Sequence, residues 1–89
     1  MLRIGIADDE RAEVVKLSRY IKEFMEKNGV DVKIDGYENG IKLEDRSALY
    51  DLVFLDIGMP DMSGIELAQK IRLTNRKLKI VYVTNYKNY

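Results

Sequence analysis

The stretch that decides the fold runs from Leu52 to Gly64 and reads LVFLDIGMPDMSG. Its first four residues form an apolar run with the length and composition of a strand buried on both faces. Asp56 ends this run and opens a turn. Open α/β sheets bind their ligands beyond the carboxyl ends of the strands. Asp56 is therefore the first candidate for a functional residue.

A second apolar run, residues 2–7, ends in Asp8 and Asp9. If the two runs form neighbouring strands, three carboxylates converge at one edge of the sheet. Such groups repel one another, and a hard divalent cation would let them coexist. Helix capping is the competing interpretation for Asp8 and Asp9, and a simple turn is the competing one for Asp56. Only the convergence of all three carboxylates, from two separate strands, favours a Mg²⁺ site.

The rest of the chain alternates between strand and helix patterns. Strands are predicted over residues 2–7, 30–37, 52–56 and 78–84, and helices over 10–28, 40–49 and 63–75. Asn39 and Ser63 are the predicted helix caps, and Asn28-Gly29 is a predicted helix stop. The apolar spacing predicts inward side chains at Val14, Leu17, Ile21, Phe24 and Met25 in the first helix and at Ile41 and Leu43 in the second. In the third helix the inward positions are expected among Ile65, Leu67, Ala68 and Ile71.

This order predicts an α/β fold, a doubly wound parallel sheet with helices on both faces. Right-handed crossovers restrict the topology, and the flavodoxin-like strand order would be 2-1-3-4. In that order the first and third strands are neighbours. The topology would therefore bring Asp8 and Asp9 to Asp56.

Composition narrows the function further. The chain has 89 residues, enough for one domain, and its 15 basic and 15 acidic residues give a net charge of zero. That balance gives no electrostatic case for binding nucleic acid or an anionic membrane. The chain contains no cysteine and no histidine, which excludes thiolate and imidazole chemistry. Its apolar runs are too short to span a bilayer, and with no signal peptide we expect a cytoplasmic protein.

With Mg²⁺ bound, Asp56 could act as a nucleophile toward phosphorus and form an acyl phosphate. The carbonyl of Gly58 could complete the metal site, and the hydroxyl of Thr84, at the end of the last strand, could hold phosphoryl oxygens. An ordinary β-branched strand residue is an equally good interpretation of Thr84 alone. A phosphatase with an aspartyl nucleophile is disfavoured, because Gly58 occupies the position where such enzymes place a second aspartate.

Together, Asp8-Asp9, Asp56 with Met59-Pro60, Gly64 and Thr84 resemble the receiver domains of response regulators, which have the CheY-like fold. The motifs DIGMP at residues 56–60 and VYVTNY at 81–86 are similar to receivers that precede LytTR DNA-binding domains. The resemblance implies that Asp56 accepts a phosphoryl group from a sensor histidine kinase. It implies Asp8, Asp9, Asp56 and the Gly58 carbonyl as Mg²⁺ ligands and Thr84 as a switch hydroxyl. Such a domain is a self-phosphorylating switch in a two-component system, not a turnover enzyme, and does not itself contact DNA.

The chain departs from that family at its end. Receivers continue with a helix, a fifth strand ending in a lysine and a fifth helix, and Lys87 does not match that lysine. We therefore expect residues 1–89 to form a receiver domain that is incomplete at the C-terminus. Its exposed fourth strand would pair in a homodimer or exchange elements, with contributions from Tyr82, Tyr86 and Tyr89. The alternative function is a phosphorylation-independent dimerisation or interaction module.

Overall fold

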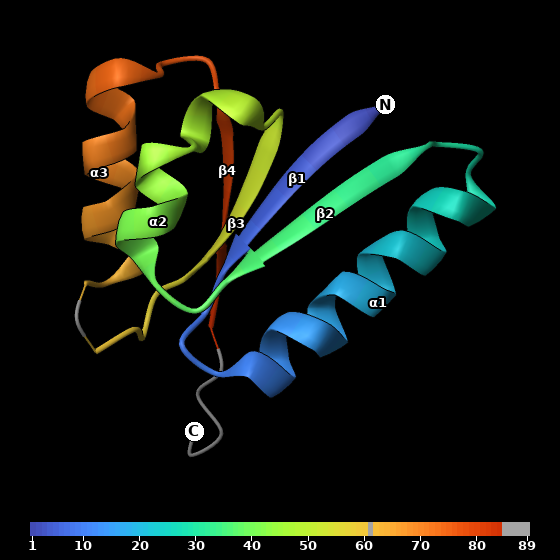
Figure 1. The fold of residues 1–89 in the computed structure, drawn as a ribbon, viewed down its shortest axis with the longest axis horizontal. Helices are drawn as coiled ribbons and strands as arrows, with labels where there is room; N and C mark the ends of the chain where they lie inside the picture. The colour runs from blue at the N-terminus through green and yellow to red at the C-terminus, as the bar shows by residue number, and fades with distance from the viewer. Residues whose placement is uncertain (61, 85–89) are drawn as a thin grey trace.

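The structure is a computed structural model that describes residues 1–60 and 62–84 of the chain. Strands and helices alternate along these residues (Figure 1). The elements are β1 (Leu2–Ala7), α1 (Arg11–Lys27), β2 (Val32–Tyr37), α2 (Gly40–Asp45), the 3₁₀ turn η1 (Ser47–Leu49), β3 (Leu52–Asp56), α3 (Gly64–Thr74) and β4 (Lys79–Val83).

The strands form one sheet in which every described pairing is parallel. Its order is β2-β1-β3-β4, so the predicted 2-1-3-4 order is confirmed. Ile4 of β1 pairs with Ile34 on one side and with Leu52 on the other. Because the strands run in one direction, the carboxyl ends of β1, β3 and β4 all lie at the same edge of the sheet (Figure 1).

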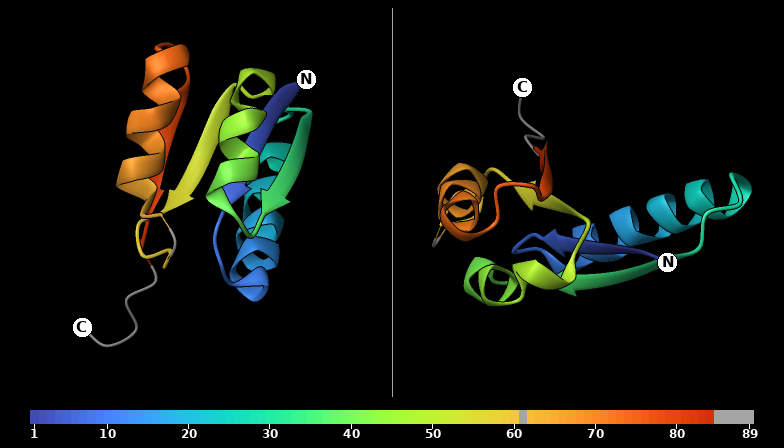
Figure 2. Two further views of the ribbon diagram at one scale, coloured as in Figure 1. Left: turned by 60° about the vertical axis from the view of Figure 1, so that its left-hand side comes forward. Right: turned by 90° about the horizontal axis from the view of Figure 1, so that it is seen from above.

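Helices cover both faces of the sheet, as predicted. In Figure 2, α1 and α2 lie on opposite sides of it. The α1 side holds a small core in which Val14 and Ile21 of the helix pack on Ile4 and Ile6 of β1. The other side holds a larger core that joins α2 and α3 to the strands. Its fully buried members include Leu43, Val53, Leu55, Leu67 and Ile71.

The predicted signals at the helix ends are confirmed. The Asn39 side-chain oxygen accepts a hydrogen bond from the Ile41 backbone N–H at 2.7 Å. The Ser63 hydroxyl accepts one from the Glu66 N–H at 3.2 Å. After α1, Gly29 adopts a φ of 70°, the left-handed conformation that ends helices and suits glycine.

Some boundaries and inward positions were predicted incorrectly. The second strand begins at Val32 rather than Val30, and the second helix ends at Asp45 before the separate turn η1. Phe24 and Ile41 are exposed, and among the four candidates in α3 the exposed one is Ile65. At about 100° per residue, positions two apart diverge by about 200°, so Ile41 cannot share an inward face with Leu43, nor Ile65 with Leu67. Phe24 lies about 60° from Ile21, at the margin of the buried stripe.

In the described part of the chain, no helix combines the length and hydrophobicity needed to cross a membrane.

Candidate functional site

Asp8, Asp9 and Asp56 converge at the carboxyl edge of the sheet. Asp8 and Asp9 follow β1, and Asp56 is the last residue of β3, the neighbour of β1. One carboxylate oxygen from each residue lies within 4.8 Å of the others. Asp8 and Asp56 are both 5% exposed, whereas Asp9 is exposed to solvent. The adjacency predicted from the strand order therefore produces a compact acidic pocket.

Two of the carboxylates also fix the loops that carry them. Asp8 Oδ1 accepts a hydrogen bond from the Glu10 backbone N–H at 2.9 Å, just before α1. Asp56 Oδ1 accepts one from the Gly58 N–H at 3.0 Å. The turn interpretation of Asp56 is therefore correct, whereas Asp8 binds the amide of Glu10, the N-cap residue of α1, and does not itself cap the helix. Asp56 Oδ2 forms no hydrogen bond with the described residues, which leaves this oxygen available for chemistry.

The loop after Asp56 folds back closely against its own strand. A Cβ added to Gly64 would lie 2.6 Å from the Asp56 carbonyl oxygen, closer than any side chain can approach. The Gly64 N–H in turn donates to the Ile57 carbonyl at 3.4 Å. Met59, within the loop, is buried in the larger core. Glycine at position 64 thus lets α3 begin directly beside the acidic pocket.

β4 reaches the same edge. Val83 pairs with Asp56, and its carbonyl accepts the Ile57 N–H at 3.0 Å. Thr84 is the next residue and is exposed. It forms no hydrogen bond with the described residues. The structure thus brings the Thr84 backbone beside the end of β3, at the edge that the sequence indicated. Lys87, Tyr86 and Tyr89 lie outside the described residues.

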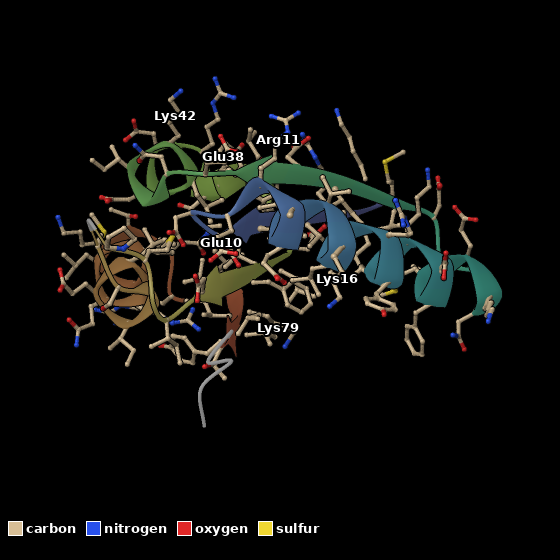
Figure 3. All side chains as sticks on the ribbon, turned by 90° about the horizontal axis from the view of Figure 1, so that it is seen from below. Glu10, Arg11, Lys16, Glu38, Lys42 and Lys79 are labelled. Carbon is tan, nitrogen blue, oxygen red and sulfur yellow. The ribbon has the colours of Figure 1, made fainter. Side chains whose placement is uncertain are left out.

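The donor set of the pocket fits a hard divalent cation. Three carboxylates offer oxygen ligands, and Mg²⁺ prefers oxygen. In octahedral Mg²⁺ complexes, ligand oxygens lie about 2.9 to 4.1 Å apart, so the 4.8 Å span needs only small side-chain adjustments. Figure 3 looks onto this edge, with Glu10 near its centre and the cationic side chains of Arg11 and Lys42 directed outward. The pocket has a concentration of negative charge for a cation to neutralise.

One polar cluster near the pocket was not predicted. The Tyr50 hydroxyl donates to Asp35 Oδ2 at 2.9 Å and also shares a short hydrogen bond with the Tyr37 hydroxyl. Burial, with these two partners, raises the pKa of Tyr50 well above its ordinary value. The Tyr37 carbonyl accepts the Asp8 N–H at 3.0 Å, which ties the cluster to the pocket. Asp35 and Tyr37 are two positions apart in a predicted strand, so the sequence indicates that they share a face. Nothing in the sequence pointed to Tyr50 as their partner.

Comparisons with known proteins agree with this geometry. Residues 4–89 match the family model of the response regulator receiver domain. The chain belongs to this family. The sensory transduction protein LytR of Staphylococcus haemolyticus is 37% identical over 84 residues, which cover 94% of this chain and 32% of LytR. The response regulator receiver protein CpdR of Brucella abortus is 32% identical, covering 97% of this chain and 68% of CpdR. This receiver therefore spans about a third of one relative and two thirds of the other.

Solved structures show the same fold. The response regulator TrrA of Thermotoga maritima, determined in complex with Mg²⁺ and BeF, superposes with a TM-score of 0.82 at 36% identity. The match covers all of this receiver and 74% of the TrrA chain. A second TrrA structure, in complex with the histidine kinase ThkA, gives a TM-score of 0.72 at 38% identity and covers 73% of that chain. The resemblance to CheY-like receiver domains is therefore confirmed.

Proposed function

We propose that this receiver accepts a phosphoryl group on Asp56. The observation that carries the proposal is the position of Asp56, which is buried at the end of β3. Its Oδ1 accepts from the Gly58 N–H, and its Oδ2 has no hydrogen bond from residues 1–60 or 62–84. Oδ2 attacks the phosphorus of a phosphohistidine, a P–O bond to the carboxylate forms, and the N–P bond to the imidazole breaks. The product is an acyl phosphate on the receiver and a free histidine on the kinase.

Asp8, Asp9 and Asp56 would hold a Mg²⁺ ion, together with the backbone carbonyl of Gly58. When bound, Mg²⁺ neutralises charge on the carboxylates and on the transferred group. Support comes from the 4.8 Å clustering of three carboxylates and from the Mg²⁺ in the related TrrA structure. The buried pair, Asp8 and Asp56, orients the site through loop amides, while the exposed Asp9 faces the solvent from which the ion enters.

Thr84 would supply the hydroxyl that contacts the phosphoryl group. Support comes from its place directly after Val83, whose carbonyl holds the Ile57 N–H beside Asp56. Because Thr84 is exposed and its hydroxyl has no hydrogen-bond partner among the described residues, it is able to turn toward a new anion. This movement would report phosphorylation to the surface around β4.

The phosphodonor would be a sensor histidine kinase, as the complex of TrrA with ThkA suggests for a relative. The receiver would act as a switch that is phosphorylated and hydrolysed slowly, not as a turnover enzyme. We also expect it to work in the cytoplasm, which fits the absence of cysteine.

Phosphoryl acceptance is tested with Mg²⁺ and a small phosphodonor such as phosphoramidate. Intact-mass spectrometry should detect one added phosphoryl group on the wild-type chain and none on Asp56→Asn. Asp45→Asn, an exposed acid at the end of α2, is the matched control and should be phosphorylated like the wild type. A folded wild-type chain without an adduct would refute the proposal.

Metal binding is tested separately from phosphorylation. Mn²⁺, a paramagnetic substitute for Mg²⁺, should broaden the backbone NMR signals of residues 8, 9 and 56–58 first, and excess Mg²⁺ should reverse the effect. Asp9→Asn should weaken the binding of both Mn²⁺ and Mg²⁺. It should not disturb the fold, because the side chain is exposed. Uniform broadening across the surface acids would count against a site at this edge.

A second copy of the chain is the other proposed partner. Val81 is 40% and Tyr82 48% exposed on β4, which has no neighbouring strand beyond it among the described residues. Unpaired apolar edges recruit other strands, so we propose a homodimer, or a swapped dimer, through β4. Sedimentation should show a dimer that Val81→Lys weakens. If Asp56→Asn dimerises normally and no phosphorylation occurs, the phosphorylation-independent interaction module becomes the better description.

A further inference from the structure

An open pocket on the α2 side of the sheet is lined by cationic side chains. These cations lie away from the acidic edge, the edge of the sheet that carries Asp8, Asp9 and Asp56. Arg3 of β1, Lys33 of β2 and Arg46, which follows α2, line a volume of about 490 Å³. Asp35 is the acidic residue in this lining, so cations outnumber it. Arg3 precedes Asp8 by five residues, about 16 Å along an extended strand. Arg3 therefore lies well away from the proposed phosphorylation site, although Tyr37, at the other end of the lining, borders Asp8.

The register of the sheet places two of these cations directly opposite each other. Arg3 of β1 pairs with Lys33 of β2. Both lie on the α2 side, because the next residues, Ile4 and Ile34, belong to the core under α1. Like charges at opposite positions of neighbouring strands destabilise a sheet. Within residues 1–60 and 62–84, neither Arg3, Lys33 nor Arg46 forms an ion pair with a carboxylate.

Arg3 also carries a buried donor without a partner. Its Nε is buried and has no hydrogen-bond partner in the described part of the chain. The carboxylate of the nearby Asp51 accepts from the Arg3 backbone N–H at 2.8 Å, not from the guanidinium. A buried donor left unpaired costs free energy, so such groups call for a partner. An oxyanion is the partner that a guanidinium binds best.

The pocket also has an aliphatic and an aromatic residue in its lining. Leu49 and Tyr50 contribute side chains beside the cations. The Tyr50 hydroxyl is held by Asp35 Oδ2 and Tyr37, which fixes the ring and directs that carboxylate oxygen toward the tyrosine. The lining thus combines an excess of positive charge with an ordered aromatic side chain. A ligand that matches it carries a small anion on a flat or apolar group.

We propose that this pocket binds a small organic phosphomonoester. Its phosphate would contact Arg3, Lys33 and Arg46, and its organic part would pack on Leu49 and Tyr50. Three cations and one carboxylate line the pocket, and a phosphate group has enough oxygens to accept hydrogen bonds from all three cations at once. Bound phosphate would also compensate the facing charges of Arg3 and Lys33.

The test uses the 89-residue chain with the Asp56→Asn substitution, without Mg²⁺, so that the acidic edge cannot contribute. Inorganic phosphate and phenyl phosphate are titrated at constant ionic strength while backbone NMR signals are followed. Both should shift the signals of residues 3, 33, 36 and 46, and phenyl phosphate should bind more tightly. The double substitution Lys33→Gln with Arg46→Gln should lower phosphate affinity by roughly tenfold or more.

The matched control is Arg19→Gln with Lys22→Gln, which removes the same charge from exposed positions on α1. Its phosphate affinity should equal that of the Asp56→Asn parent. Three outcomes would overturn the proposal. They are shifts confined to residues 8, 9 and 56–58, an equal loss of affinity in the control, or equal affinities for inorganic and phenyl phosphate, which would leave no role for an organic group.

Discussion

The acidic edge and the tyrosine cluster are two polar clusters of this receiver, and they differ in how their partly buried polar groups are paired. Tyr37, Tyr50 and Asp35 satisfy one another through hydrogen bonds. Asp8, Asp9 and Asp56 bring three like charges together, with amides of Glu10 and Gly58 bound to two of them. A cluster of complementary groups stabilises the fold by itself, whereas a cluster of like charges gains stability when a cation neutralises it.

Gly64→Ala should produce the largest loss of stability, because it attacks the support of the acidic edge. The new Cβ would lie 2.6 Å from the Asp56 carbonyl oxygen, so the loop or the start of α3 must move. We expect a loss of about 3 kcal/mol in the free energy of unfolding, measured by urea denaturation, and weaker Mg²⁺ binding. Gly58→Ala is the control, since its Cβ would meet Asp56 Oδ1 at an ordinary 3.7 Å. Equal losses in the two variants would contradict the close-approach argument.

Tyr50→Phe should damage the tyrosine cluster. It removes the hydroxyl that joins Tyr37 to Asp35 and leaves both partners unpaired. We expect a loss of about 2 kcal/mol in the free energy of unfolding. Tyr20→Phe, at a position 62% exposed, should have no measurable effect on urea denaturation. A neutral Tyr50→Phe variant would show that the hydrogen bonds add nothing net to stability.

The same cluster predicts a loss of stability in alkali. Burial and the hydrogen bonds to Tyr37 and Asp35 raise the pKa of Tyr50 in the folded chain, so folding favours the protonated phenol. This contribution is complete below the unfolded pKa of about 10 and is lost as the pH rises above it. Urea denaturation at about pH 9 and about pH 11 should therefore show a larger decline for the wild type than for Tyr50→Phe. Parallel declines would exclude Tyr50 as the cause.

Asp56→Asn should stabilise the metal-free receiver, the reverse of its effect on function. The amide oxygen can still accept the Gly58 N–H, while the repulsion from Asp8 and Asp9 within 4.8 Å disappears. We expect a gain of about 1 kcal/mol in metal-free buffer, and this gain should shrink when Mg²⁺ is added to both proteins. A destabilised variant would mean that repulsion does not dominate the acidic edge.

Phe24→Gln should have the smallest effect. Phe24 is 62% exposed at the margin of α1, so the substitution should change the free energy of unfolding by less than about 0.5 kcal/mol. Ile21→Gln, one turn earlier at a position 8% exposed, should cost several times more. Similar losses in urea denaturation would show that Phe24 packs in solution.

The local signals in the sequence predicted most of this receiver. Asn39 and Ser63 cap helices as expected, because a cap depends on residues two or three positions away. Ile41 was predicted incorrectly because positions two apart in a helix point in nearly opposite directions, and Phe24 because hydrophobicity alone does not fix how far the buried stripe extends around a helix. The pairing of Arg3 with Lys33 could not be predicted either, because the register between two strands depends on both strands and on how they pack.

The sequence by itself determined the alternating elements, the strand that ends at Asp56 and the three acids available for one site. Tertiary structure decided that Asp8 and Asp56 become buried while Asp9 stays exposed, and that Tyr50 bridges Tyr37 and Asp35. The physical reason is one of range. Helix and strand patterns arise from neighbours along the chain, whereas burial and long-range hydrogen bonds exist only once the sheet has assembled.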